Sequence, residues 1–254
     1  MRTILTSTCK EMGRWVAIHA AADLRTAIQE NGSANLVVAT GASQFEVLDA
    51  LVQQPEIDWT RVQGFHLDEY VGLDDSHGAS FCRYLRERFV ERVPLSDFHF
   101  LNGLADPAET ISRVGAIISK TRIDLALVGI GENGHLAFND PPADFETTSP
   151  YLVVELDEPC RLQQVGEGWF DSLQDVPTHA MSMSVQQILR SAKIYCSVPD
   201  ERKAQAVRDT LECEIDPTIP ASILRTHAAT TLVIDHAAAS KLSDSILADL
   251  ERVE

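Results

Sequence analysis

The stretch Asp124–Pro142, DLALVGIGENGHLAFNDPP, says more about the fold than any other part of the chain. An apolar strand is expected at Leu125–Val128, followed by a loop that carries His135 and, five residues later, Asp140. The loop is rich in glycine, with Gly129, Gly131 and Gly134. Glycines let a backbone adopt otherwise costly conformations and approach a ligand closely. A buried strand that ends in this way is typical of open α/β sheets, whose ligands bind at the carboxyl ends of the strands.

The same loop allows simpler interpretations. GIGENG has the letters of a GxGxxG dinucleotide fingerprint, but Pro141 and Pro142 oppose the helix that must follow such a loop. The loop could also be a tight turn in which His135 is only structural. The functional hypothesis is that Asp140 fixes the tautomer of His135, which titrates near neutral pH and exchanges protons. No metal is expected, because no HxxxH or HxH cluster supplies convergent ligands.

Apolar strands alternate with amphipathic helices along almost the whole chain. We expect strands at 35–40, 62–66, 98–101, 123–129, 152–156, 193–198 and 231–234. We expect helices at 9–31, 79–92, 107–120, 183–192, 200–213 and 236–252, and one more that ends near Gln53. This alternation predicts a single α/β domain over 1–254, with an open, mainly parallel, Rossmann-like sheet and helices on both faces. The segment 140–180 is rich in polar and turn residues and is a candidate lid or active-site loop.

The composition limits the kinds of partner. The chain has 254 residues, a formal net charge of −17 and 44% hydrophobic residues. An acidic protein is not expected to bind nucleic acid or an anionic membrane surface, and an anionic ligand would need a local cationic site. No apolar run approaches the ~18 residues of a membrane span, and the N-terminus lacks the apolar core of a signal peptide. The five cysteines are scattered without CxxC spacing, which favours reduced thiols in a cytoplasmic protein.

Polar side chains also end two other predicted strands. Thr40-Gly41-Ala42-Ser43 ends one strand where a helix begins, and backbone N–H groups at such a place bind phosphate well. The alternative is a capping box, in which Ser43 caps the helix and Glu46 reaches back. Glu46 would then oppose a bound phosphate.

Asp68 and Glu69 follow a further strand. Because side chains alternate in a strand, only one of the two acids should face a ligand. Adjacent acids are also common as solvated loop residues. Lys203 lies near the start of a predicted helix, and by itself it would be a solvated surface lysine.

Taken together, these stretches resemble the glucosamine-6-phosphate deaminase (isomerase) family. The matching pieces are ATGASQFEVLDAL, the strand that runs into DEYVGL, GIGENGHLAFNDP and KAQAV. They occur in the order of the family and cover most of residues 35–210. The related 6-phosphogluconolactonases share the fold, but Tyr70 and Phe138-Asn139-Asp140 favour the deaminase side.

The resemblance implies amino-sugar catabolism, in which glucosamine 6-phosphate and water give fructose 6-phosphate and ammonia. It implies that Asp68 moves a proton between C2 and C1 of the opened sugar. His135 would assist ring opening, and Asp140 would orient His135. The phosphate would be held by Lys203 and by the loop of Thr40, Gly41, Ala42 and Ser43. No cofactor or metal is implied, and the only partner expected is a small sugar phosphate.

The chain departs from the family pattern at several positions. Asn133 stands where one branch has Asp, so His135 depends more on Asp140, and Asp140 itself stands where Glu is usual. The phosphate-binding arginine of the family is not matched, and Arg161 is the candidate replacement. Residues 141–160 hold no Lys or Arg, which predicts that allosteric regulation by an effector phosphate is absent.

Two alternatives to the deaminase stay open. One is a lactonase of the same fold, acting on a sugar phosphate. The other is a non-catalytic sugar-phosphate sensor, as in transcription regulators, although we expect no room for their DNA-binding segment in the acidic sequence before residue 35. The changed positions also leave room for another sugar phosphate or an unphosphorylated sugar. A homo-oligomer is possible, but the sequence does not determine the oligomeric state.

Overall fold

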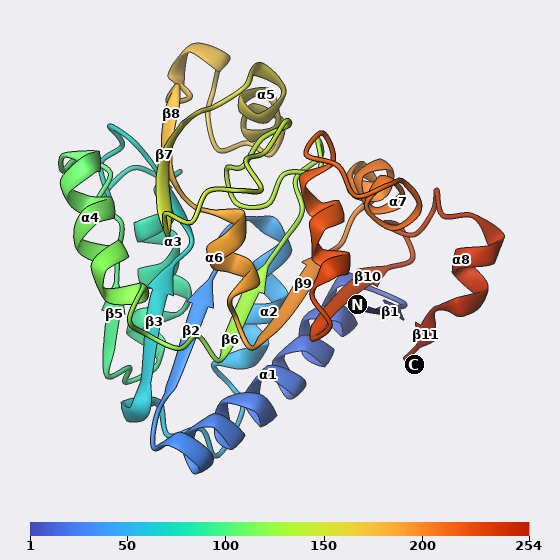
Figure 1. Ribbon diagram of the computed structural model, residues 1–254, viewed down its shortest axis with the longest axis horizontal. Coiled ribbons are helices and arrows are strands. Elements are labelled where there is room, and N and C mark those ends of the chain that lie inside the picture. The colour runs from blue at the N-terminus through green and yellow to red at the C-terminus, as the bar shows by residue number, and fades with distance from the viewer. Residues whose placement is uncertain (254) are drawn as a thin grey trace.

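An eight-stranded parallel sheet forms the centre of the computed structural model, which describes residues 1–253 (Figure 1). The strand order is β11-β1-β10-β9-β6-β2-β3-β5, and every pairing is parallel. The strands are β1 (Arg2–Thr6), β2 (Ala34–Val38), β3 (Val62–His66), β5 (Asp97–His99), β6 (Leu125–Val128), β9 (Lys193–Val198), β10 (Thr230–Asp235) and β11 (Glu251–Arg252). The central strand β6 is buried along its whole length, as its continuous apolar sequence requires.

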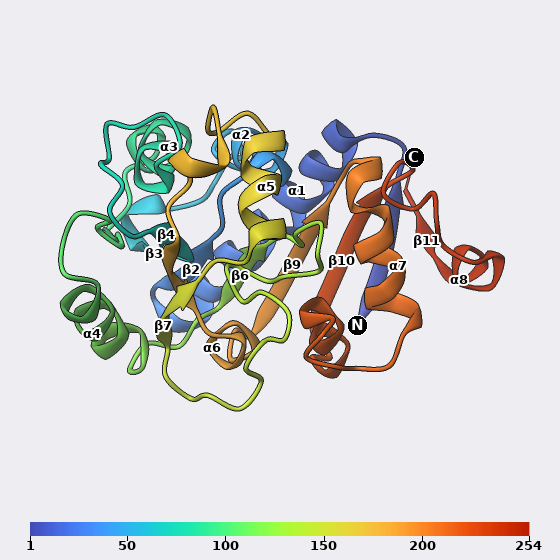
Figure 2. The same ribbon diagram turned by 90° about the horizontal axis from the view of Figure 1, so that it is seen from above.

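Helices cover both faces of this sheet, as Figure 2 shows from above. On one face lie α1 (Cys9–Asn31), α2 (Phe45–Leu51) and α3 (Phe81–Arg88), which share a core with the side chains of β2 and β3 that point toward them. On the other face lie α4 (Pro107–Ile118), α6 (Val185–Leu189) and α7 (Ala204–Glu212). The fold class expected from the sequence is confirmed.

A smaller antiparallel sheet stands beside the carboxyl ends of the large sheet (Figure 1). Its strand order is β4-β8-β7, from β4 (Asp68–Tyr70), β8 (His179–Met183) and β7 (Tyr151–Glu155). Together with α5 (Glu158–Gly166) it encloses a separate cluster of aromatic side chains that includes Tyr70 and Phe138. Because β4 follows β3 after a single residue, this sheet fixes the chain where Asp68 leaves the large sheet.

Several expectations about individual elements are wrong. The closing helix expected at 236–252 is a series of turns followed by α8 (Asp244–Asp249) and β11. The Asp235 carboxylate accepts the N–H of Ala238 at 2.8 Å and tightens the turn, and β11 pairs with β1 at the sheet edge. The helix expected at 183–192 shortens to α6 because the preceding residues pair in β8. Strand β1 and helix α5 were not expected. The strand expected at 152–156 is confirmed as β7, within the otherwise irregular segment 140–180.

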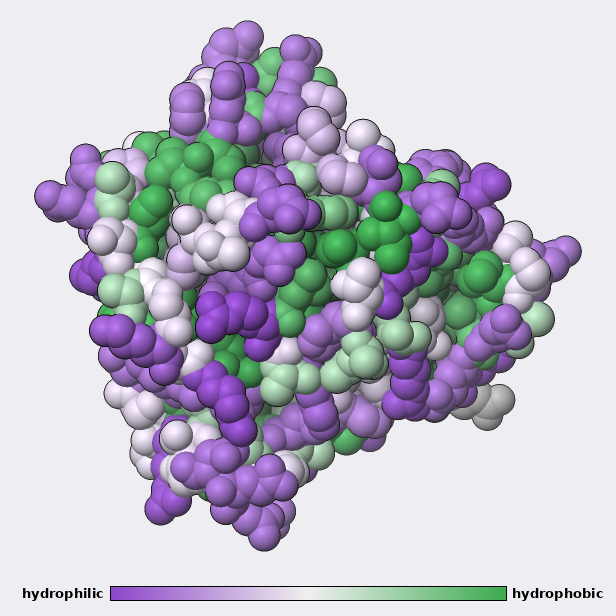
Figure 3. Space-filling model, viewed as in Figure 1, coloured by the Kyte–Doolittle hydropathy of each residue, from purple (hydrophilic) through white to green (hydrophobic). Residues whose placement is uncertain are grey.

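Polar and apolar residues are interspersed over the face in Figure 3. The large apolar side chains that are exposed lie on different elements, and they are Ile18, Leu104, Val153, Leu162 and Ile215. Single exposed apolar residues of this kind are normal in folded proteins. Within residues 1–253, none of the helices is long and apolar enough to cross a membrane.

Candidate active site

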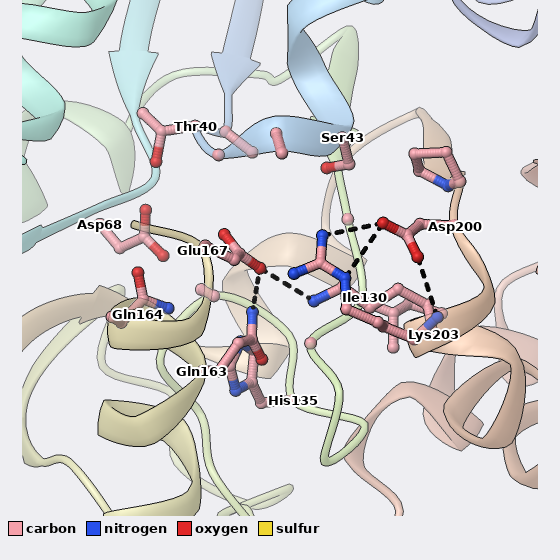
Figure 4. Close-up of a pocket in the computed structure, with 18 of the residues that line it drawn as sticks. Thr40, Ser43, Asp68, Ile130, His135, Gln163, Gln164, Glu167, Asp200 and Lys203 are labelled. Atoms are coloured by element: carbon pink, nitrogen blue, oxygen red, sulfur yellow. Dashed lines mark hydrogen bonds and ion pairs between the residues drawn. The ribbon is translucent and has the colours of Figure 1, made fainter. Parts of the chain in front are cut away.

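A cavity of about 410 Å³ opens at the carboxyl ends of the parallel strands (Figure 4). Its walls come from the loops after β2, β3, β6, β9 and β10, with α5 and the turn that follows it on one side. Ligands of open α/β sheets bind at this edge. The polar and charged residues of the lining are Thr40, Ser43, Asp68, His135, Gln163, Gln164, Glu167, Asp200, Arg202, Lys203 and Asp235.

The loop after β2 lines the cavity with Thr40, Gly41, Ala42 and Ser43. Gly41 has φ 88°, a conformation that favours glycine. The capping-box interpretation of Ser43 is wrong, because a 3-10 turn at Ala42–Gln44 comes first and α2 begins only at Phe45, without a side-chain cap.

The Ser43 hydroxyl therefore faces the cavity, where it accepts a hydrogen bond from Gln44 Nε2 at 3.2 Å. A Cβ at Gly129 would lie 2.7 Å from Ser43 Oγ, so a larger residue where β6 meets this loop would displace the hydroxyl. The hydroxyl can donate its proton to a ligand in the cavity.

The two acids after β3 point in different directions, as the alternation of a strand requires. The Glu69 carboxylate accepts hydrogen bonds from the backbone N–H groups of Phe81 at 3.2 Å and Cys82 at 2.7 Å, and from the Ser80 hydroxyl at 3.1 Å. The N–H groups at the start of a helix have no acceptor within the helix, and at the start of α3 the Glu69 carboxylate accepts from them instead. Asp68 lines the cavity, and its Oδ1 is buried without a hydrogen-bond partner among residues 1–253.

Burial, with a contribution from the nearby charge of Glu69, raises the pKa of Asp68 from 3.8 to about 8. A carboxylate whose conjugate acid has a pKa in this range is a stronger base than an ordinary aspartate. Such a shift in a cavity is a feature of catalytic acids and bases. The residue is only 6% exposed, so its ionisation depends on what else occupies the cavity.

His135 lines the cavity, and its partners lie behind it. His135 Nδ1 and Asp140 Oδ1 are 2.9 Å apart, and Asn133 Nδ2 donates to the same oxygen at 3.0 Å. The backbone N–H of Asp157 donates to Asp140 Oδ2 at 3.2 Å. Neither Asn133 nor Asp140 is part of the described cavity lining. The arrangement leaves Nε2 of His135 as the nitrogen that can exchange a proton with a ligand.

Burial alone would raise the pKa of Asp140, but the hydrogen bonds from His135, Asn133 and the Asp157 N–H lower it below the usual value. Asp140 is therefore ionised throughout the neutral range. The His135 ring packs closely on Gly131, where a Cβ would lie 2.3 Å from Nε2. This contact explains the second glycine of the loop.

Two cationic side chains line the cavity within residues 1–253, Lys203 and Arg202. Lys203 is 8% exposed, and its Nζ lies 3.3 Å from Glu167 Oε1. Arg202 contacts the Asp200 carboxylate at 2.8 Å and 3.1 Å. Sequence reasoning missed Arg202, although it stands directly before Lys203.

The structure does not bring Arg161 to the cavity, so it is not a replacement for the missing arginine. Its Nη2 donates to the carbonyls of Leu173 at 2.7 Å and Val176 at 3.0 Å. These carbonyls belong to the turn after α5 and hold the guanidinium away from the ligand side. The same helix instead presents Gln163 and Gln164 to the cavity, and its C-cap residue Glu167 lines the cavity too, which the sequence did not suggest.

The sulfur of Cys160, a residue for which the sequence suggests no role at the site, lies within 4.8 Å of ligand atoms of His135 and Asp140. Burial, followed by the charges of Asp140 and Asp157, raises the pKa of the Cys160 thiol. A metal-binding cysteine must lose its proton. The raised pKa of the Cys160 thiol therefore does not favour a metal at this cluster.

The model of the family of glucosamine-6-phosphate isomerases and 6-phosphogluconolactonase matches residues 7–233. The chain belongs to this family. Among similar members, a glucosamine-6-phosphate deaminase from an Exiguobacterium species is 36% identical over 84% of this chain and 82% of its own. The glucosamine-6-phosphate deaminase of Clostridium acetobutylicum is 32% identical over 95% of this chain and 100% of its own.

The fold of this chain is similar to that of solved structures of the same family. A monomeric glucosamine-6-phosphate deaminase has a TM-score of 0.86 and 31% identity, covering 94% of this chain and 99% of its own. A 6-phosphogluconolactonase from Shewanella baltica has a TM-score of 0.75 and 20% identity, covering 92% of this chain and 97% of its own. The second likeness concerns the fold alone.

Proposed function

We propose that this family member is a glucosamine-6-phosphate deaminase, which converts glucosamine 6-phosphate and water into fructose 6-phosphate and ammonia. The observation that carries the proposal is the meeting of Asp68 and His135, from separate strands, in one cavity with two cations. The similar deaminases, at 31–37% identity, agree with it. The function lies in amino-sugar metabolism.

Ring opening is the first step, and His135 is the group for it. An imidazole transfers a proton between the ring oxygen and the C1 hydroxyl, which opens the sugar to its aldehyde form. Asp140 holds Nδ1 of His135, so the free Nε2 serves the substrate. Asn133 keeps the Asp140 carboxylate and the backbone N–H of His135 in place through its amide, at 3.0 Å and 3.1 Å.

Proton transfer between carbons is the second step, and Asp68 is the base. The ionised carboxylate removes the proton from C2 and returns it to C1. The amino group loses one proton, the C1 oxygen gains one and becomes a hydroxyl, and the carbon–nitrogen bond at C2 becomes an imine. Water adds to this imine carbon and ammonia leaves, so that the ketone of fructose 6-phosphate remains. The steps need only acids and bases of this chain, and the proposal includes no cofactor.

Two cationic side chains bind the phosphate of the substrate. Lys203 and Arg202 both line the cavity, together with the Ser43 hydroxyl. The N–H groups at the beginning of the 3-10 turn at Ala42–Gln44 lack intrahelical acceptors and add further donors. A local site of this kind is necessary because the whole protein is acidic, with a net charge of −17.

A substrate panel tests the proposal against its alternatives. The protein is incubated separately with glucosamine 6-phosphate, glucosamine and 6-phosphogluconolactone, and ammonia and lactone hydrolysis are measured. We expect the rate of ammonia release from glucosamine 6-phosphate to be at least about tenfold higher than the rate from glucosamine. Faster lactone hydrolysis would support the lactonase instead. Tight binding of glucosamine 6-phosphate without turnover would support the sensor.

Two finer points belong to the same proposal. We place the enzyme in the cytoplasm, because its five cysteines are free and a reducing compartment keeps them so. We also propose that it lacks allosteric activation, since 141–160 contains no basic residue. A sigmoidal rate curve that N-acetylglucosamine 6-phosphate makes hyperbolic would contradict this second point.

A further inference from the structure

Glu167 is an acid placed where a phosphate is expected. Its side chain is 9% exposed and lines the cavity beside Lys203 (Figure 4). The carboxylate receives hydrogen bonds from Gln163 Nε2 at 2.8 Å and Trp169 Nε1 at 3.2 Å, and Lys203 Nζ lies at 3.3 Å. Glu167 is thus held by three donors, and two of them are neutral.

These contacts fix the carboxylate independently of Lys203. Gln163 lies one helical turn before Glu167 on α5, and Trp169 follows it in the next turn of the chain. When Lys203 turns toward an anion, both neutral donors still hold Glu167 in the cavity. The negative charge therefore stays beside the ligand.

The cationic end of the cavity carries no surplus of positive charge. Within the described residues its two cations are Arg202 and Lys203, and each contacts an acid that lines the same cavity. Arg202 contacts Asp200 at 2.8 Å, and Lys203 contacts Glu167. A phosphate must compete with a carboxylate for each of them.

We propose that Glu167 determines the specificity of this end of the site by limiting its affinity for a doubly charged phosphate. The identity of the phosphate ligand rests on the proposed function. A phosphate oxygen bound to Lys203 at the usual ~2.8 Å lies within about 6 Å of the carboxylate that Lys203 contacts. At this separation one pair of like charges weakens binding by a factor on the order of ten. Weak binding of this kind favours release of the phosphorylated product.

The experiment measures binding and does not need turnover. Dissociation constants are determined by calorimetry for inorganic phosphate, for fructose 6-phosphate without ammonia, and for fructose. The variant is Glu167→Gln, which keeps the size of the side chain and an oxygen that accepts from Gln163. Its matched control is Glu158→Gln, an exposed glutamate in the first turn of the same helix and outside the cavity lining.

We expect Glu167→Gln to bind inorganic phosphate and fructose 6-phosphate about tenfold more tightly than the unmodified protein. Fructose binding should be unchanged, and Glu158→Gln should stay within about twofold for all three probes, as an exposed, distant charge should. Equal or weaker phosphate binding in Glu167→Gln would overturn the proposal, as would a failure of both proteins to bind phosphate.

Failure of the deaminase function has a different signature. A protein that releases no ammonia but gains phosphate affinity in Glu167→Gln would retain this inference and lose the proposed reaction. If Glu167→Gln does not fold, as judged by its thermal unfolding, Glu167→Ala takes its place. The alanine also removes the charge, and the same gain in phosphate affinity is expected.

Discussion

Replacing Asp68 by Asn should stabilise the folded protein while removing its activity. Asp68 is 6% exposed, and one of its carboxyl oxygens is buried without a partner among residues 1–253. Its ionisation in the fold is therefore costly, and an amide of nearly the same shape avoids that cost. The stability gain should grow with pH, which separates it from an ordinary packing effect.

The size of the effect follows from the pKa of Asp68, which burial and then the charge of Glu69 raise from 3.8 to about 8. Between these values the unfolded chain loses its proton while the folded protein keeps it. The free energy of unfolding therefore falls with rising pH, by about 1.4 kcal/mol per pH unit from this one group. This contribution is complete below pH 3.8 and is lost as pH rises to about 8. The advantage of Asp68→Asn should thus be about 3 kcal/mol larger at pH 7 than at pH 5.

Urea unfolding of both proteins at the two pH values measures this difference. All other titrating groups are common to the two proteins and cancel. An advantage of the variant that is equal at pH 5 and pH 7 would refute the reasoning about the buried carboxyl group. A variant that becomes relatively less stable with rising pH would refute it more strongly.

Three further substitutions test other parts of the site. Gly131→Ala should lower kcat by at least about tenfold, since its Cβ would meet the His135 ring at 2.3 Å and displace it; a crystal structure with an unmoved ring and full activity would contradict this. Asp140→Asn should lower kcat by about 10²-fold or more with little change in KM, because the amide no longer fixes the tautomer of His135; wild-type kcat in steady-state assays would remove Asp140 from its proposed role. Lys203→Gln should raise KM for glucosamine 6-phosphate by about 10-fold or more while kcat changes less; an unchanged KM would show that the phosphate lies elsewhere.

The sequence predicted the inner strands of the central sheet, and it placed Asp68 and His135 after two of them. The continuous apolar run of β6 and the glycines after it indicate a buried strand that ends at a ligand site. Asp68 and His135 each follow such a strand. Since parallel strands of this fold end at the same edge, their meeting in one cavity could be expected before the structure.

The walls of the cavity from α5 were harder to predict. Glu167 and Gln163 lie in a segment that is polar throughout, so hydrophobic periodicity does not reveal which side faces the cavity. A signal for the helix was nevertheless present. Asp157 followed by Pro159 is a typical helix start, and Asp157 does cap α5 by accepting the N–H of Cys160 at 2.6 Å.

The remaining errors have tertiary causes. Ser43 fits a capping box by its letters, but the 3-10 turn before α2 moves the start of the helix past it. The alanine-rich segment 236–243 has high helix propensity, yet the Asp235 side chain tightens it into a turn. Residues 251–252 pair with β1, which lies at the other end of the sequence. A local sequence pattern cannot predict a pairing over this separation.

The central claim is that Asp68 is the base of a deaminase, and the parallel release of its two products tests that claim most directly. Ammonia and fructose 6-phosphate are measured from glucosamine 6-phosphate, with Asp68→Asn beside the unmodified protein and Asp74→Asn as an exposed acidic control outside the cavity lining. The account predicts equimolar products from the unmodified protein and the control, and a rate lower by at least about 10²-fold in Asp68→Asn. Equimolar products at the full rate from folded Asp68→Asn would contradict it.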